Sequence, residues 1–589
     1  MCGIGGIVRH AGGLQHERER LVGLRDRLRH RGPDGEGLHL DEQVALVHTR
    51  LALQDPAGGE QPLRSPDGRY TLVYNGEIYD AEALRAELAD AWTFRTRCDT
   101  EVVLAAYVRW GSACLPRLNG MFAFFVWDAV HAVGFAARDR LGVKPFVYAR
   151  TRDSFVFASE AKALLAELES PPAVALDALL EVLVVPCFSG VETPLFEGLA
   201  YLPPGHCLRV TRTGVDVWAW GEYTPCDEDD APPSPERLQA ALADAVRRTS
   251  IADAPVGVYA SGGLDSTLVA SLMRRAGAQP RAFTVAFAEQ DRYDYTRSLI
   301  VTSDDGPFAT LAAEELGLDQ QLVPVSRAQL GDDLATVAAH DDALPAWEQE
   351  LAQHHLARAA AVHCKAVLVG DAADETHYGY HFLLDAEATR SPRGIIERFT
   401  TPVVRRELLP DPVAHFDAKY RRLTEGAGIG WDHPDDRIRA TTWLILRRWL
   451  PRLLHNGDIH AMAHSLEARV PFADTELLEL ARRVPPSLGL RGGVEKWLLR
   501  EAARGLMPEA IRLRKKSALP KDQGVAPLLQ REASRALDEA GPSLRRVIDL
   551  ERARALCKPH RPIDERERAL LFRLTCLVHW ARTYDVRMP

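Results

Sequence analysis

The second residue of the chain is a cysteine, and glycines fill three of the next four positions, in the stretch MCGIGG. Removal of Met1 would place the Cys2 thiol beside its own α-amino group. A free α-amino group has a pKa of about 7.7–8.0, so part of it is neutral near pH 7 and can take the thiol proton. Cys2 is therefore a candidate nucleophile, although the stretch taken alone favours a small buried cysteine. The glycines are expected to let the backbone turn tightly there.

The groups that such a nucleophile needs follow within the first hundred residues. Arg50, in HTRLAL, can pair with a substrate carboxylate through two hydrogen bonds. In YNGEIYD, the Asn75 side-chain amide and the Gly76 backbone N–H can form an oxyanion hole. Glu77 and Asp99 supply carboxylates for an α-ammonium group and an amide. Any one of these motifs is also typical of a structural turn. The interpretation as a catalytic site therefore rests on their occurrence together.

A second set of chemical residues lies in VYASGGLDST, where an apolar strand gives way to a helix. The glycines let backbone N–H groups face an anion, and the start of a helix attracts negative charge. Ser261 and Ser266 add hydroxyl donors, and Asp265 can hold Mg²⁺. The sequence lacks G-x-x-x-x-G-K-[ST], so this is not a Walker A loop.

A companion loop occurs in VLVGDAADETHYGY, which also leaves an apolar strand. It carries three acidic residues, Asp371, Asp374 and Glu375. One interpretation is a solvated acidic turn. The other is a metal-facing loop at the same carboxyl edge of the sheet, where open α/β folds bind ligands.

The pattern of predicted strands and helices that must position these groups changes near residue 230. The first two hundred residues predict short strands with Gly-rich turns; LVGLRDRLRH predicts a helix, and YTLVYNGEIY a strand running into a turn. CDEDDAPPSPE (226–236) is acidic and Pro-rich, as linkers are. Strands then alternate with helices (PVGVYA, STLVASLMRRAG, RAFTVAF, FATLAAEELGL, KAVLVG), which predicts a parallel sheet covered by helices on both faces. Beyond residue 380 the pattern is mostly helical.

Composition excludes several classes of protein. The 589 residues are 46% hydrophobic and 26% charged, as in ordinary globular proteins of two to four domains. The net charge of −10 argues against a nucleic-acid partner. Nine scattered cysteines without a C-x-x-C pair argue against a disulfide framework or a zinc knuckle and fit a reducing cytoplasm. No signal peptide or membrane-spanning stretch is visible.

Taken in order, the front motifs MCGIGG, RGPDG, HTRLAL, YNGEIY, DTEV, LNGMFAF, RDRLGVKP and FASEAKAL resemble the glutaminase domain of class II, N-terminal-nucleophile amidotransferases. The resemblance implies that Cys2 is the nucleophile and that Asn75 and Gly76 form the oxyanion hole. It also implies that glutamine is bound by Arg50, Asn75, Glu77 and Asp99.

The back motifs resemble the synthetase domain of the asparagine synthetase family, an ATP-pyrophosphatase fold. The resemblance implies a phosphate-binding loop at 261–266, with Mg²⁺ held by Asp265 and Asp374. Asp371 matches a catalytic acidic residue, and Lys516 matches the lysine of an R-x-K motif that neutralises the adenylate. The implied ATP-binding residues are Ala260, Ser261, Gly262, Gly263, Asp265, Ser266, Val285, Val369 and Gly370.

Together the two resemblances predict an α+β glutaminase domain of stacked antiparallel sheets (1–222), a linker (223–236) and an α/β synthetase domain with a mostly helical C-terminal part (237–589). The expected reaction is ATP-driven, glutamine-dependent amidation of a carboxylic acid through an acyl-adenylate, with aspartate as the default acid. We expect a cytoplasmic enzyme that uses Mg²⁺, with a homodimer as one arrangement.

Three segments depart from the family pattern. The loop that usually reads S-G-D-G-A-D-E-L-F-G-G-Y is altered at 369–380, the acidic D-E-P segment appears as DDALP (341–345), and D-R-M-S-M-A-H-S appears as DIHAMAHS (458–465). Ile459 thus stands where the family has an arginine; it either enlarges an apolar substrate pocket or packs against a helix.

These departures keep a specialised amidating enzyme of secondary metabolism as an alternative. The intact Cys2, Asn75 and Asp99 argue against a cyclase of the lasso-peptide or β-lactam type, which would not need the glutaminase set. Asp265, Asp374 and Lys516 argue against a non-catalytic homologue.

Overall fold

The computed structural model describes residues 2–189, 194–224, 231–288, 290, 293, 295, 301–400, 403–518, 522, 524–540 and 544–588. Met1 and residues 225–230 of the predicted linker lie outside this part. The last two residues of that linker, Pro235 and Glu236, already belong to a helix that Ser234 caps through its side chain. Among the described helices, none combines the length and the apolar character that a bilayer crossing requires.

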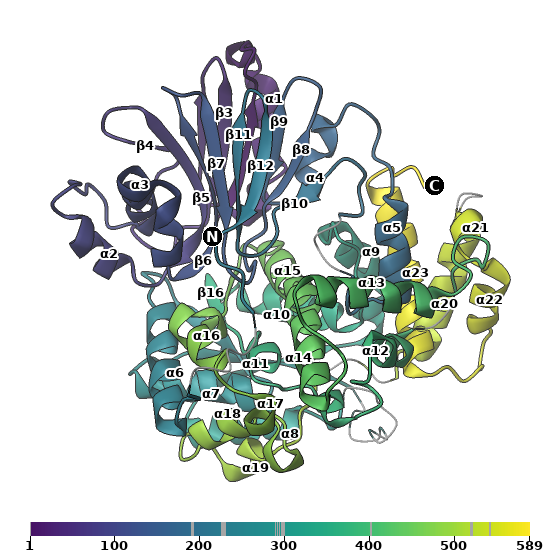
Figure 1. Ribbon diagram of the computed structural model, residues 1–589. Helices are drawn as coiled ribbons and strands as arrows, with labels where there is room; N and C mark the ends of the chain where they lie inside the picture. The colour runs from purple at the N-terminus through teal and green to yellow at the C-terminus, as the bar shows by residue number, and fades with distance from the viewer. Residues whose placement is uncertain are drawn as a thin grey trace.

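The front part of the chain is a sandwich of two six-stranded antiparallel sheets (Figure 1). The first sheet, in the order β10-β8-β9-β1-β3-β2, contains β1 (Cys2–Val8), β2 (Gly35–Leu40), β3 (Val44–Arg50), β8 (Val147–Arg150), β9 (Phe155–Ala158) and β10 (Ala200–Tyr201). The second, in the order β12-β11-β7-β6-β5-β4, contains β4 (Leu63–Arg64), β5 (Tyr70–Ile78), β6 (Gly120–Asp128), β7 (Val133–Arg138), β11 (His206–Thr211) and β12 (Gly214–Ala219).

Large apolar residues that alternate along these strands fill the space between the two sheets, among them Ile4, Val73, Phe125 and Phe157. The helices of this part are α1 (Arg18–Asp26), α2 (Ala81–Leu88), α3 (Asp99–Trp110), α4 (Ala161–Leu164) and α5 (Leu176–Val184). Helix α1 ends four residues earlier than LVGLRDRLRH suggests, yet Leu21, Leu24 and Leu28 are all buried.

The second part is built on a five-stranded parallel sheet in the order β15-β14-β13-β16-β17. Its strands are β13 (Val256–Tyr259), β14 (Arg281–Phe287), β15 (Asp319–Val325), β16 (Ala366–Leu368) and β17 (Glu467–Arg469). The helices that accompany them are α6 (Pro235–Thr249), α7 (Leu264–Arg275), α8 (Gly306–Leu316), α9 (Arg327–His340), α10 (Gln349–Ala360) and α11 (Ala373–Thr376). The chain runs outward from β13 to β15 and then crosses to β16, so the strand order reverses between β13 and β16.

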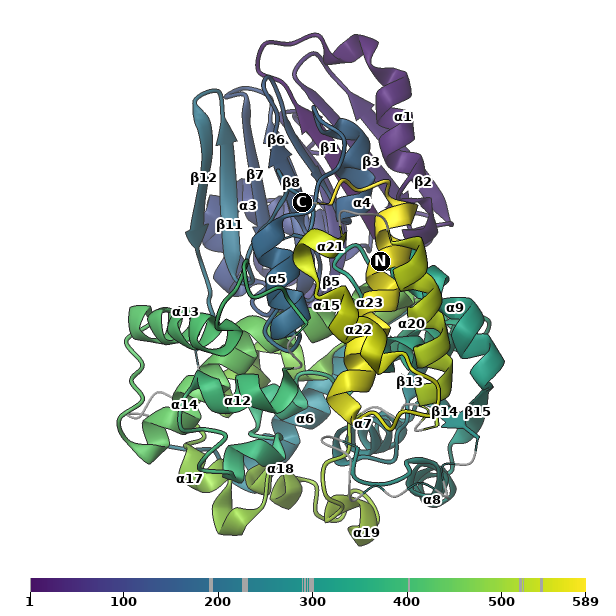
Figure 2. The same ribbon diagram turned by 90° about the vertical axis from the view of Figure 1, so that its right-hand side faces the viewer.

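The rest of the chain is helical, as predicted. It contains α12 (Pro392–Phe399), α13 (Pro412–Gly426), α14 (Pro434–Leu444), α15 (Leu450–Met462), α16 (Thr475–Ala481), α17 (Pro486–Gly489), α18 (Trp497–Ala502), α19 (Glu509–Arg512), α20 (Ala526–Glu539), α21 (Leu544–Val547), α22 (Leu550–Leu556) and α23 (Glu565–Thr583). Figure 2 shows α20 and α23 side by side, and α9 packs against both. The antiparallel sandwich, the parallel sheet and the helical end confirm the predicted fold class.

Candidate active sites

Cys2 opens β1, where the two sheets of the sandwich meet. It lies opposite Arg50 of β3, and its backbone N–H donates to the Asn75 side-chain oxygen on β5 at 3.1 Å. Burial raises the pKa of the Cys2 thiol, against the lowering influence of Arg50. A buried thiol of raised pKa needs a base beside it before it can attack.

The expected tight turn of the glycines behind Cys2 is wrong. They lie in the straight strand β1, and none of them has a positive φ. A Cβ on Gly3 would lie 2.5 Å from Thr49 Oγ1, and one on Gly6 would lie 2.5 Å from the Phe157 ring. The glycines are therefore needed because neighbouring side chains press against the strand that holds the predicted nucleophile.

The Asn75–Gly76 pair also lies in a strand, since β5 continues to Ile78 instead of turning. Among the described residues, the Asn75 Nδ2 atom is buried without a hydrogen-bond partner. A Cβ on Gly76 would meet the Met121 carbonyl oxygen at 2.4 Å, so only glycine fits there. An unused amide donor beside a thiol is what an oxyanion would require.

Besides Asn75, the three other predicted glutamine-binding residues surround the same point but already have protein partners. Arg50 donates to the carbonyl oxygens of Gln54, Asp55 and Pro56 at 2.7–3.1 Å. Asp99 accepts from the Tyr74 hydroxyl at 2.7 Å and from the Ile78 N–H at 2.9 Å.

Glu77 contacts the Gln54 amide and, at 3.2 Å, the Arg469 guanidinium. Burial raises the pKa of both Glu77 and Asp99. A bound ammonium group would therefore favour their ionised forms.

Two buried arginines that the sequence analysis left unassigned join this site to the second part of the chain. Arg31 donates to the Cys2 carbonyl at 3.2 Å, to Glu160 at 2.8 Å and to Asp458 of α15 at 2.7 Å. Arg469 belongs to β17 and pairs with both Glu77 and Glu467. The contacts that join the two parts, Arg31 with Asp458 and Arg469 with Glu77, link positions hundreds of residues apart, so no local pattern predicts them.

The SGGLDS segment leads from β13 into the first turn of α7 at the carboxyl edge of the parallel sheet. Gly262 has φ +65°, and a Cβ there would lie 2.2 Å from the Ala309 backbone nitrogen, so the turn requires glycine. Gly263 is the N-cap residue of α7. The hydroxyls of Ser261 and Ser266 lie 3.0 Å apart and contact each other.

The acidic loop after β16 lies directly beside it, because β13 and β16 are adjacent parallel strands. A Cβ on Gly370 would lie 3.0 Å from the Asp265 Cβ. Burial raises the pKa of Asp371 to about 6, against the lowering influence of Lys516. Although burial opposes it, the ammonium groups of Lys496 and Lys516 lower the pKa of Asp374 to about 2.

Lys496 is the residue of this site that sequence reasoning missed. Its ammonium lies 2.5 Å from Asp265 Oδ2 and 2.5 Å from Asp374 Oδ1, and it has φ +56°, which is unusual for a lysine. Lys516, which was predicted, contacts the other oxygen of Asp374. Arg514 also belongs here, since it donates to the Gly262 carbonyl at 3.1 Å.

The same carboxylates fit a hard divalent cation. Asp265 Oδ1 is buried without a hydrogen-bond partner in the described part of the chain. Asp265 and Asp374 approach closely enough to share one lysine. Carboxylate oxygens are the ligands that Mg²⁺ prefers.

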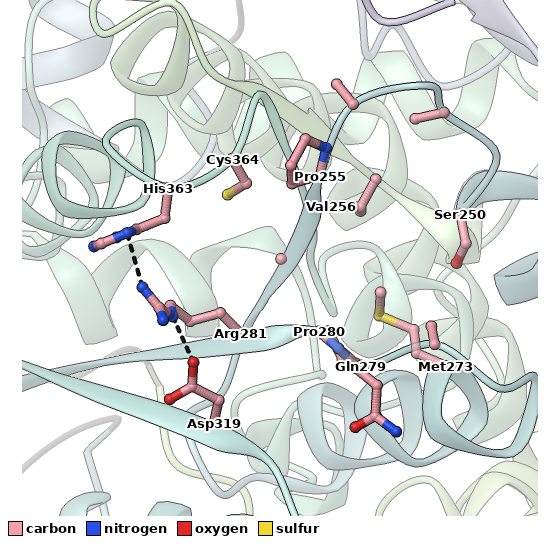
Figure 3. A pocket seen from close by; sticks show the side chains of 14 residues that line it. Ser250, Pro255, Val256, Met273, Gln279, Pro280, Arg281, Asp319, His363 and Cys364 are labelled. Carbon is pink, nitrogen blue, oxygen red and sulfur yellow. Dashed lines mark hydrogen bonds and ion pairs between the residues drawn. The ribbon is translucent and has the colours of Figure 1, made fainter.

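The remaining predicted ATP residues, Ala260, Val285 and Val369, are buried toward the carboxyl ends of three neighbouring strands. A cavity of about 490 Å³ lies at the opposite, amino edge of this sheet (Figure 3). There Arg281 joins Asp319 and His363, each at 2.7 Å. This cavity is thus separate from both sites.

The segments that depart from the family pattern carry ion pairs of their own. Asp341 pairs with Arg452 at 2.9 Å, and Asp342 accepts from the Tyr201 hydroxyl at 3.2 Å. Ile459 is 1% exposed within α15. Its burial favours packing within the protein over contact with substrate.

Comparisons with known proteins divide the chain in the same order. A family model described as a glutamine amidotransferase domain matches residues 1–221, and one described as asparagine synthase matches residues 237–582. Asparagine synthetase (glutamine-hydrolyzing) 3 of Bacillus subtilis is 32% identical over 538 residues, covering 88% of this chain and 87% of that protein.

The amidase chry2 of Gibberella zeae is 29% identical and covers 87% of each chain. Among solved structures, the glutamine phosphoribosylpyrophosphate amidotransferase of B. subtilis, complexed with ADP and GMP, matches 55% of this chain and 66% of its own. It has a TM-score of 0.28 and 19% identity.

Proposed function

The chain belongs to the asparagine synthase family, and from that premise we propose that it amidates aspartate. We also propose which residues carry out each half-reaction. It is a glutamine-hydrolysing ligase that couples ATP to the amidation of a carboxylate. The residue assignment rests on one observation. Three carboxylates and two lysines lie together where the strand order of the parallel sheet reverses.

In the first half-reaction, the Cys2 thiol attacks the side-chain amide carbon of glutamine. Once Met1 is removed, the Cys2 nitrogen is an amine that takes the thiol proton and passes it to the departing ammonia. Its contact with Asn75 fixes this nitrogen, and the unused Asn75 Nδ2 faces the developing oxyanion. Water then cleaves the thioester to give glutamate.

In the second half-reaction, an aspartate carboxylate attacks the α-phosphorus of ATP and pyrophosphate leaves. Lys496 and Lys516 are buried cations placed to neutralise the phosphates. Mg²⁺, held by Asp265 and Asp374, would supply further neutralisation of the triphosphate. Ammonia then displaces AMP, and Asp371, ionised at neutral pH, accepts the proton that the attacking nitrogen loses.

The two sites are close to one short stretch of α15, which supports an internal passage for ammonia. Asp458 pairs with Arg31, whose Nε donates to the Cys2 carbonyl. A Cβ on the preceding Gly457 would lie 3.5 Å from the Asp371 carboxylate. Adjacent residues of one helix thus face the two sites.

The test is pyrophosphate release with ATP, glutamine and a panel of carboxylic acids, in wild type and Asp265→Asn. We expect release with aspartate and its loss in the variant by several orders of magnitude, with glutaminase turnover retained. Normal release by Asp265→Asn would refute the phosphate-loop assignment.

A second candidate is a specialised amidotransferase that acts on a different acid. It is favoured by the similarity to a fungal amidase and by the altered segments at 341–345 and 458–465. A kcat/KM for aspartate of about 10⁴ M⁻¹s⁻¹ or more would exclude it. A cytoplasmic location and a homodimer stay predictions.

A further inference from the structure

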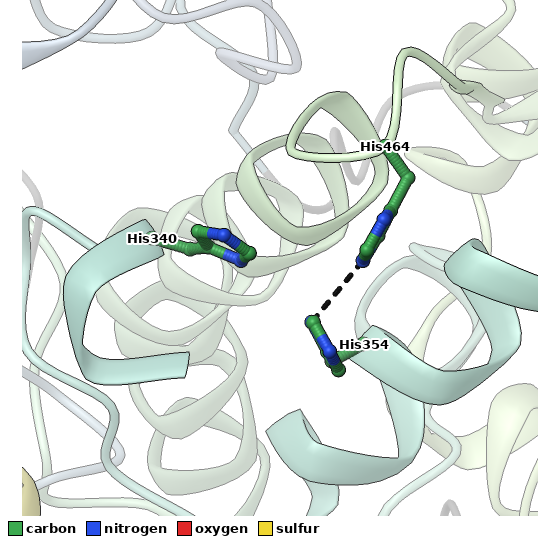
Figure 4. A group of neighbouring side chains, drawn as sticks. All are labelled: His340, His354 and His464. Carbon is green, nitrogen blue, oxygen red and sulfur yellow. Dashed lines mark hydrogen bonds between the residues drawn. The ribbon is translucent and has the colours of Figure 1, made fainter. Parts of the chain in front are cut away.

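Three histidines from separate segments meet, and none of them belongs to either proposed active site. His340 ends α9, His354 lies in α10 and His464 follows α15 by two residues. One ring nitrogen of each lies within 4.8 Å of the others (Figure 4). His354 is buried, whereas His340 and His464 are half-buried, so the group can be reached from solvent.

Two neighbouring clusters of similar composition are already balanced by protein groups. In Asp341–Asp342–His455, the histidine contacts both carboxylates, at 3.3 and 3.4 Å. In Asp341–Glu350–His460, Arg452 supplies the opposing charge at 2.9 Å from Asp341. These clusters therefore need no cation.

The three-histidine cluster lacks such compensation. One hydrogen bond joins His464 Nε2 to His354 Nδ1 at 3.2 Å. The His340 Nδ1 atom is buried and has no hydrogen-bond partner within the described ranges. A buried polar nitrogen without a partner is costly, so a metal ion or a water molecule is expected to satisfy it.

The spacing suits a metal ion that prefers imidazole. Zinc–nitrogen bonds of about 2.0–2.1 Å in a tetrahedron separate neighbouring nitrogens by about 3.3–3.4 Å. The observed 3.2 Å between His354 and His464 is close to that edge. Lys162, whose ammonium donates to the His340 carbonyl, is held by Glu160 at 2.9 Å, which offsets its charge.

We propose that His340, His354 and His464 bind one divalent transition metal of the zinc class, with water as the fourth ligand. Each imidazole stays neutral and carries its single N–H on the nitrogen that does not bind the metal. The hydrogen bond between His354 and His464 is lost, and the ring that donated it carries its proton on its other nitrogen instead. No proton is lost overall.

Such an ion would connect α9, α10 and the turn that leads to β17. In that turn, the Ser465 hydroxyl donates at 2.6 Å to the carbonyl of His30, the residue before Arg31. The metal would thus fix the contact between the two halves of the chain, and it takes no part in either half-reaction. Its expected effect is on stability.

The experiment starts from the full-length chain, stripped with a chelator and kept in excess Mg²⁺. Titration with Zn²⁺ should show one bound equivalent and a raised Tm. Because His340 and His464 are half-buried, His340→Gln and His464→Gln should fold yet bind Zn²⁺ at least 100-fold more weakly. His415→Gln, at an exposed position of α13, is the matched control and should bind as wild type does.

Co²⁺ identifies the ligands independently, because a site of imidazoles gives visible d–d bands without a thiolate charge-transfer band. Such a spectrum in wild type, lost in folded His340→Gln and His464→Gln, supports the proposal. Absence of tight Zn²⁺ binding in wild type would overturn it. So would unchanged binding in both variants, or a thiolate band that shows the ion on a cysteine.

Discussion

The Cys2 thiol is buried and hard to ionise, so its reactivity depends on the few polar atoms around it. Those atoms are its own backbone nitrogen and the Asn75 side chain. Asn75 uses its oxygen to hold the Cys2 nitrogen and leaves its Nδ2 unused among the described residues. One amide group can therefore both position the base and stabilise negative charge.

The Cys2→Ala variant should lose glutamine hydrolysis but retain amidation with added ammonium, because the proposed nucleophile and the proposed adenylation residues lie in separate sites. Glutamate formation and AMP formation, measured with each nitrogen source, check this expectation. If a folded variant loses both activities equally, the assignment of the two half-reactions is wrong.

The Asn75→Ala variant should lower the glutaminase kcat by about 10²–10³, the usual cost of one oxyanion donor. Its KM for glutamine should change much less, since the donor acts mainly in the transition state. Ammonium-dependent amidation serves as the internal control. A large rise in KM with unchanged kcat would mean that Asn75 binds glutamine without stabilising the oxyanion.

At the scale of elements, α15 carries buried polar residues that contact both parts of the chain. A π-helical segment, Ile445–Trp449, joins α14 to α15, so the two form one continuous helix. Its buried polar residues face both halves of the chain: Asp458 contacts Arg31, and His455 contacts the segment that contains Asp341 and Asp342. The helix is therefore held by charge as well as by apolar packing.

Stability should fall with rising pH through the His455 contact. Burial alone would lower the pKa of His455, but Asp341 and Asp342 raise it to about 9, above the value of about 6.5 in an unfolded chain. The contribution of this contact to the free energy of unfolding is therefore fully present below pH 6.5 and is lost between pH 6.5 and 9. Its upper limit is about 3 kcal/mol.

The check is to compare the Tm of wild type and His455→Gln at pH 6, 7.5 and 9. The difference in Tm between the two proteins should be largest at pH 6 and become smaller as the pH rises. A difference that stays constant across this range would show that the imidazolium charge does not contribute to stability.

At the scale of the whole molecule, two buried arginines connect the halves of the chain. Arg31 joins Cys2 of β1 to α15, and Arg469 joins β17 to Glu77. The C-terminal end returns to the first half as well, since Arg587 pairs with Ala173 in an isolated bridge. The two sites are thus held in a fixed relation by contacts distant in sequence.

Replacing Arg31 with methionine should uncouple the two half-reactions. The change removes the cation that Glu160 and Asp458 share, but Lys162 still pairs with Glu160 at 2.9 Å and Lys144 with Asp458 at 3.4 Å. The cost should therefore stay below the roughly 3–5 kcal/mol of an uncompensated buried charge. We expect the ratio of glutamate formed to AMP formed to rise several-fold as ammonia escapes.

Arg29→Met is the matched control, because Arg29 lies two positions away and its side chain is 65% exposed. The control should keep the ratio of the wild type. A folded Arg31→Met variant with that same ratio would show that the arginine has no part in coupling.

The sequence by itself determined the family resemblance, the fold class and the main strands. RAFTVAF is the strand β14 from its first to its last residue, and SGGLDS spans the turn before α7 and the first three residues of that helix. These features are local: a buried parallel strand needs a run of apolar residues, and a phosphate loop needs glycines at set positions. The pattern therefore suffices without knowledge of the rest of the chain.

Only the tertiary structure decided which charged residues meet. Arg31 and Asp458 are 427 positions apart, and Lys496 reaches Asp265 across 231. It also decided that the glycines after Cys2 accommodate Thr49 and Phe157 instead of making a turn. The physical reason is the same in each case. The partner of a buried charge and the space beside a strand are set by the packing of distant segments, which a local pattern does not record.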